Sequence, residues 1–164
     1  MAIRSFTDEQ AVQIAIKIEK KGAQFYRMAR GVCKEGNLVK LLKMLEAQEG
    51  DHAAAFEALL DLLPKKQENS PARGAYSAES SAFLSAVAAE VVFPGGVMAR
   101  MMSSSLNTVR DILLHAIQSE KDSILFYQEI GLNTEEPALT ALLKEIIREE
   151  KKHLGDLQSL LEES

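Results

Sequence analysis

The chain has 164 residues and a net charge of −5, and 26% of its residues are charged. This length and composition predict a folded protein of one domain, residues 1–164, with a buried core. The acidic balance argues against nucleic acid and against an anionic membrane surface as partners, because both need a basic protein surface.

The single cysteine, Cys33, excludes an intramolecular disulfide and a tetrathiolate metal site. The first residues become acidic at once and contain no long apolar run, so they do not resemble a signal peptide. The most apolar stretch, from about 87 to 102, contains Glu90 and Arg100 and is broken by Pro94-Gly95-Gly96. These features predict a protein of the reducing cytoplasm that does not enter a membrane.

The first predicted helix runs from about 7 to 29. Thr7 and Gln10 fit a capping box, in which the threonine caps the helix and the glutamine lies three residues on. Gly31 is a candidate stop, since glycine often follows the last turn of a helix. Apolar residues follow helical spacing along this segment, at Ala11, Ile14, Ala15, Ile18, Gly22, Phe25 and Ala29.

The second predicted helix has Asn37 as its cap and ends before Pro64. Its apolar stripe has a gap, and Glu49 and His52 fill the core-facing positions there. The stripe itself consists of Leu38, Leu42, Leu45, Phe56, Leu59 and Leu63.

A long crossover is predicted from about 65 to 107. Residues 65–76 are typical of a polar loop, and a short amphipathic helix follows over about 77–92. The apolar face of this short helix is predicted to contain Phe83, Val87 and Val91.

The third helix is predicted from about 108 to 130, with Gly131 as its stop, and residues 133–137 form a tight connection to the fourth. The apolar stripe of the fourth helix again has a gap, and Glu150 and His153 occupy the core-facing positions there. Its members are Leu139, Leu143, Ile146, Leu157 and Leu160. Two helical hairpins joined by one long crossover predict an all-α four-helix bundle.

The two halves of the chain repeat one pattern of metal-ligand residue types. A glutamate is followed thirty residues later by Glu-x-x-His, and the second copy lies 101 residues after the first (120 − 19 = 101). The repeated residues are Glu19, Glu49 and His52, then Glu120, Glu150 and His153. Residues three apart on a helix share a face, so each Glu-x-x-His pair can reach one ion.

The energetics of burial favour metal ions at this cluster. A lone Glu-x-x-His usually lies on a solvated helix face, but here both copies fall in core-facing positions. Four buried carboxylates would repel one another and lose their hydration unless cations lay among them. Two divalent ions balance the four charges, and carboxylates with some imidazole suit iron or manganese.

This pattern resembles the ferritin-like superfamily, and specifically the rubrerythrin-like branch of the di-iron carboxylate proteins. The resemblance covers about 7–64 and 108–163. It implies a ferritin-like four-helix bundle in which the six repeated residues bind two iron ions, with manganese or zinc as alternatives in the isolated protein. It also implies that Glu49 and Glu150 bridge the two ions.

The chain departs from rubrerythrins in two ways. It lacks the four cysteines of their rubredoxin-like domain, so electrons are expected from an external donor. Where rubrerythrins usually place a further carboxylate, one turn after the third-helix glutamate, this chain has Ser123. This second departure puts a rubrerythrin-like peroxidase activity in question.

Three further aromatic side chains have two interpretations each. Tyr26 and Tyr127 lie seven residues after the first glutamate of each half, where their phenols can bond a ligating carboxylate or simply pack in the core. His115 does not lie on the face of Glu120, so we interpret it as a packing or surface histidine.

The resemblance implies an oxidoreductase that reduces hydrogen peroxide or O2, because two nearby metals can hold both oxygens of such a substrate. An iron-binding or ferroxidase protein that stores or delivers iron is an alternative. A bundle with purely structural metal is another. A homodimer is expected because related bundles often pair.

Overall fold

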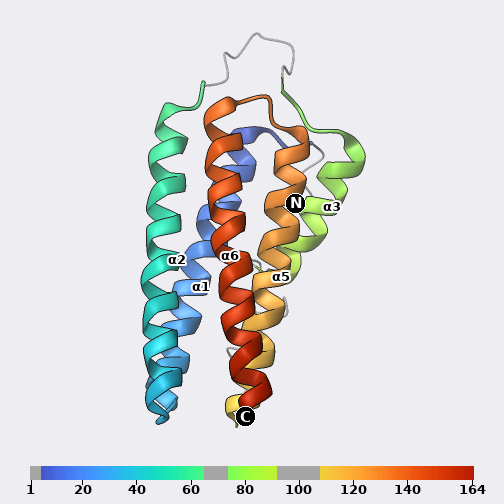
Figure 1. The fold of residues 1–164 in the computed structure, drawn as a ribbon. Coiled ribbons are helices and arrows are strands. Elements are labelled where there is room, and N and C mark those ends of the chain that lie inside the picture. Colours follow the sequence, from blue (N-terminus) through green and yellow to red (C-terminus); the bar gives the residue numbers. More distant parts are fainter. Residues whose placement is uncertain (1–4, 65–73, 92–107) are drawn as a thin grey trace.

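The computed structural model describes residues 5–64, 74–91 and 108–164. Four long helices run side by side, and the shorter α3 lies against α5 (Figure 1). The described ranges contain no strand, and none of their helices is long and apolar enough to cross a membrane. The helices are α1 (Asp8–Val32), α2 (Gly36–Leu62), α3 (Ala78–Val91), α5 (Val109–Asn133) and α6 (Pro137–Glu163).

The repeat seen in the sequence is also a repeat of the backbone. α5 starts and ends 101 residues after α1 (109 − 8 and 133 − 32), and α6 has the same offset from α2 (137 − 36 and 163 − 62). α1 packs most extensively against α2, and α5 against α6. The bundle therefore consists of two equivalent hairpins, as the sequence predicted.

The N-terminal cap of α1 confirms one prediction, and α5 starts close to the predicted residue 108. The Thr7 hydroxyl accepts a hydrogen bond from the Gln10 N–H, and the Gln10 side chain accepts one from the Thr7 N–H at 3.1 Å. These two bonds form the predicted capping box. α5 starts in the same way, since the Thr108 hydroxyl accepts from the Asp111 N–H at 3.0 Å.

Three predicted helix boundaries are wrong. Gly31 and Gly131 lie inside α1 and α5, which continue to Val32 and Asn133. Neither helix needs a left-handed glycine at its end. The residue that follows each helix has an extended backbone, and its N–H still donates to a carbonyl oxygen of the last turn. Asn37 lies within α2, which starts at Gly36 without a side-chain cap.

The predicted apolar stripes of α1 and α2 are buried, and they divide into two core clusters. On α1, residues 11–18 join one cluster and residues 25–29 join the other, with Glu19 between them. On α2 the same division leaves Glu49 and His52 in the middle. The polar residues of the repeat therefore occupy a layer with apolar packing above and below.

The short helix α3 was predicted correctly in extent, but its buried face was predicted only in part. Val87 packs against the core as predicted, but Leu84 and Ala88 are the fully buried residues, whereas Phe83 is 40% exposed. The reason is a polar anchor at the start of α3, where the Ser80 hydroxyl donates to Glu129 at 2.7 Å and thus turns the 80–84–88 face towards α5. The Val91 side chain and the Pro94-Gly95-Gly96 break lie outside the described part.

Candidate metal centre

The structure brings all six repeated residues together at the middle of the bundle. Each of them is at most 5% exposed, and they come from the four long helices. Their donor atoms form two overlapping groups, in each of which the atoms lie within 4.8 Å of one another. One group is Glu19, Glu49, His52 and Glu150, and the other is Glu49, Glu120, Glu150 and His153.

Two carboxylates belong to both groups, Glu49 and Glu150. This is the arrangement expected of carboxylates that bridge two ions. The Nδ1 atom of His52 lies 2.9 Å from Glu150 Oε1 and 3.3 Å from Glu19 Oε2. The corresponding distances from His153 Nδ1 are 3.4 Å to Glu150 Oε2, 3.5 Å to Glu49 Oε1 and 3.7 Å to Glu120 Oε2.

These approaches are within ion-pair distance but are not hydrogen bonds, and this provides a test of whether a cation fits. Each of the six residues has a buried donor atom without a hydrogen-bond partner, and Glu150 has two. An unpaired buried polar atom costs about 1–3 kcal/mol, so a cluster of them is unfavourable without a ligand. The lone pairs of these carboxylates and imidazoles converge, as a site for divalent ions requires.

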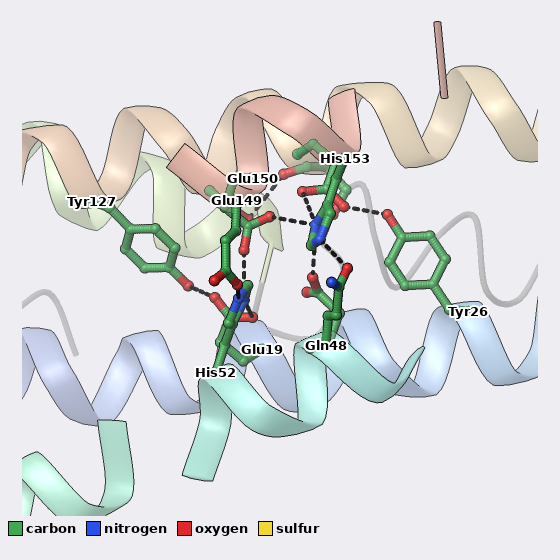
Figure 2. Close-up of polar contacts among 12 residues, drawn as sticks. Glu19, Tyr26, Gln48, His52, Tyr127, Glu149, Glu150 and His153 are labelled. Carbon is green, nitrogen blue, oxygen red and sulfur yellow. Dashed lines mark hydrogen bonds and ion pairs between the residues drawn. The ribbon is translucent and has the colours of Figure 1, made fainter. Parts of the chain in front are cut away.

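The outer nitrogen of each histidine is held by the opposite hairpin (Figure 2). His52 Nε2 lies 2.6 Å from Glu149 Oε2, and His153 Nε2 lies 2.6 Å from Gln48 Oε1. Because both partners are acceptors, Nε2–H is the donor in each case and the Nδ1 lone pair is free for a metal. Sequence reasoning missed Gln48 and Glu149, although each directly precedes a repeated glutamate.

The two tyrosines flank the cluster from opposite sides (Figure 2). The Tyr26 phenol donates to Glu120 Oε1, and the Tyr127 phenol donates to Glu19 Oε1. Each tyrosine thus bonds a glutamate of the other half of the chain. Their proposed role in supporting the ligands stays a prediction, but these bonds fix the orientation of two carboxylates.

Without metal, the cluster retains protons. Burial raises the pKa of Glu49 and Glu120 well above the usual range, and it also raises that of Glu19. Burial alone would lower the pKa of His52, but its carboxylate neighbours outweigh burial and raise the pKa to about 11. The pKa of His153 rises to about 9 by the same balance.

Of the four glutamates among the six repeated residues, Glu150 is the one whose pKa falls. Burial would raise it, but contacts with Glu120 and with both histidines lower it below the usual range. Among the carboxylates of the metal-free cluster, Glu150 is therefore the one whose surroundings favour the ionised form, beside two histidines whose pKa values are raised. Metal ions at the cluster would displace these protons.

Two neighbouring positions refine the sequence analysis. The Ser123 hydroxyl donates to the Ser119 carbonyl oxygen of its own helix at 3.0 Å, so it supplies no further carboxylate. His115 is buried with its ring edge-on to Phe25, at 4.7 Å between centroids, and burial lowers its pKa to about 4. This agrees with a packing histidine outside the metal cluster.

Gly22 gives the Glu49 carboxylate room against α1. A Cβ atom at Gly22 would lie 2.4 Å from Glu49 Oε2. We expect Gly22→Ala to fold with equal or higher stability when metal-free, because alanine in a helix gains about 0.5–1 kcal/mol over glycine. Its affinity for Co(II) should fall by roughly tenfold, as for a change just outside a metal's ligands.

Equilibrium dialysis with Co(II) and urea unfolding of the metal-free protein measure the two effects of Gly22→Ala separately. Gly155→Ala is the matched control, since its added Cβ meets nothing within 4 Å. Equal Co(II) affinity for Gly22→Ala and the native chain would show that Glu49 does not need this space.

Comparisons with known proteins agree with this geometry. Residues 111–164, which contain Glu120, Glu150 and His153, match the rubrerythrin family model. A solved structure described as a ferritin-like diiron-carboxylate protein from Thermotoga maritima is 26% identical, with a TM-score of 0.70 over 98% of each chain. No curated protein matches significantly. The chain therefore has the ferritin-like fold and resembles rubrerythrin, as its duplicated Glu-x-x-His pattern predicted.

Proposed function

We propose that this protein is a dinuclear-iron oxidoreductase that reduces hydrogen peroxide or O2 with electrons from an external donor. The observation that carries this proposal is the pair of overlapping ligand groups that share Glu49 and Glu150. A site for one structural ion would not need two groups with common carboxylates. The predicted cytoplasmic location and homodimer belong to this proposal as well.

The metal ions and the protein chain would contribute different parts of the reaction. Two iron ions in the cluster would supply two electrons by changing from ferrous to ferric. Hydrogen peroxide would take up those two electrons and two protons and leave as two molecules of water. An external reductant would then return the electrons, since one cysteine among the 164 residues cannot form a tetrathiolate redox site.

The residues of the chain hold and shield the site. Glu19, Glu120 and the two histidines each have a second contact that fixes the side chain, so the ligand atoms are preorganised. The apolar clusters on either side keep bulk water away from the middle of the bundle. Such a site favours a small oxidant over a large organic substrate.

Anaerobic reconstitution with Fe(II) tests the proposal. We expect two iron ions per chain and a visible ferric absorption band after addition of hydrogen peroxide or O2 in separate samples. Glu57→Gln, a change at an exposed glutamate paired with Lys20, is the control and should behave like the native chain.

Three results would contradict the proposal. One ion or none per chain would rule out the dinuclear site. Two ions without a spectral response would indicate structural metal. Oxidation by O2 followed by release of iron, without turnover by added reductant, would favour iron storage or delivery.

A further inference from the structure

The two halves of the chain differ at the pair of positions that hydrogen-bond the histidines of the metal cluster. Gln48 and Glu149 are equivalent in the repeat (149 − 48 = 101), and both accept a hydrogen bond from a histidine of the opposite hairpin. Each bond measures 2.6 Å. The geometry is the same in the two halves, but one acceptor is an amide and the other is a carboxylate.

We propose that this difference makes the two metal positions unequal, and that Glu149 makes the position beside His52 the tighter one. This inference rests on metal binding by the six repeated residues, which the proposed function also needs, but not on any reaction. Glu149 is a positioning residue, because it acts on the metal only through the His52 ring.

The physical reason lies in the charge of the acceptor. A carboxylate that accepts from the outer N–H of an imidazole orients the ring and raises the basicity of the inner nitrogen more than a neutral amide does. His52 Nδ1 is therefore the stronger donor of the two inner nitrogens. The carboxylate also adds one negative charge beside this position, which favours a cation there.

The surroundings of the two acceptors do not cancel this difference. Both are half-buried, and the Glu149 side chain is 35% exposed. His52 and His153 are almost equally buried, and their rings stack at 5.8 Å between centroids. Each histidine shares its group with three carboxylates: Glu49 and Glu150 are common to both groups, and Glu19 and Glu120 are equivalent in the repeat. The acceptor of the outer N–H is therefore what distinguishes the two histidines.

Stepwise binding of Co(II) to the full chain tests this inference, because the spectrum of Co(II) reports the number and type of its ligands. The native chain should bind the first ion more tightly than the second. Glu149→Gln keeps the size and the accepting oxygen but removes the charge, and it should weaken the first step by roughly tenfold. Gln48→Glu should tighten the second step by a similar factor.

Two controls show whether Glu149 acts through His52. Glu145→Gln changes an exposed glutamate one helical turn earlier on α6 and should leave both steps unchanged. In the His52→Ala background, Glu149→Gln should no longer affect Co(II) binding, whereas in the His153→Ala background it should still cost about tenfold. Circular dichroism verifies that each variant is folded.

The outcomes separate this inference from the proposed function. Two ions per chain with no change in either step on Glu149→Gln would overturn the inference and leave the dinuclear site intact. An equal loss of Co(II) affinity at both steps would overturn the inference too, because it would show that the charge of Glu149 acts on both metal positions alike. No Co(II) binding by the native chain would overturn both.

Discussion

Chelation of the bound metal is expected to lower the midpoint of thermal unfolding by about 10–20 °C near neutral pH. Each ion at a free concentration 100 times its Kd contributes about 2.7 kcal/mol, and 1 kcal/mol shifts the midpoint by about 2–4 °C in a chain of this size. The loss is large because the cluster sits between the two apolar cores, where seven donor atoms have no other partner.

The loss of stability on chelation should grow as the pH rises. The direction of this change follows from the pKa shifts of the two histidines. His52 and His153 have folded pKa values of about 11 and 9, above the value of 6.5 for a free histidine. The metal-free native state then binds more protons than the unfolded state, so its stability falls as pH rises from about 6.5 to 9. Each retained proton contributes up to about 1.4 kcal/mol per pH unit.

The glutamates of the cluster do not reverse this trend. The raised pKa values of Glu19, Glu49 and Glu120 also lower the stability of the metal-free protein as the pH rises above 4.5. The lowered pKa of Glu150 acts in the opposite direction, but only below 4.5. Hence a metal-free protein that becomes more stable between pH 6.5 and 9 would contradict the protonated cluster.

Differential scanning calorimetry at pH 6, 7.5 and 9, with and without a chelator, provides the measurement. The metal-loaded protein is the control, because metal ions replace the protons on these ligands. Its unfolding midpoint should vary much less with pH than that of the metal-free protein.

The cluster of six residues was predictable because the repeat identifies glutamates and histidines at one spacing, and helical periodicity places them towards the core. The fold followed from the same periodicity, since the apolar stripes predicted for α1, α2 and α6 are buried, with Leu160 partly buried. Periodicity depends only on residues within one helix, and the repeat compares residues along the sequence, so neither signal describes a contact between the hairpins.

The contacts between hairpins were not predictable in this way. The position of Tyr127 indicated a possible bond to a ligating carboxylate but not which one, and its phenol donates to Glu19 of the other half. Gln48 and Glu149 reach the histidines only because α2 and α6 of the two hairpins pack against each other. Phe83 is exposed for a related reason, since a contact to α5 decides the orientation of α3.

The two shared carboxylates should respond differently to the same substitution. Glu49→Gln and Glu150→Gln each remove a charge from both ligand groups, so each should abolish binding of two ions per chain. In the metal-free protein, however, burial and the neighbouring carboxylates raise the pKa of Glu49 well above its usual range, which favours its protonated form. An amide resembles a protonated carboxyl, so Glu49→Gln should leave the stability of the metal-free protein nearly unchanged.

Glu150→Gln should instead destabilise the metal-free protein by about 3–5 kcal/mol at pH 7, the usual cost of breaking a buried ion pair. The reason is that Glu150 is the ionised partner of both histidines, at 2.9 Å from His52 Nδ1 and 3.4 Å from His153 Nδ1. Urea unfolding of the chelated proteins measures this difference, with Glu145→Gln as an exposed control on the same helix. Equal destabilisation by the two substitutions would mean that the charge of the metal-free cluster is shared between Glu49 and Glu150. A selective effect would show that the negative charge is concentrated on Glu150, the carboxylate that touches both histidines.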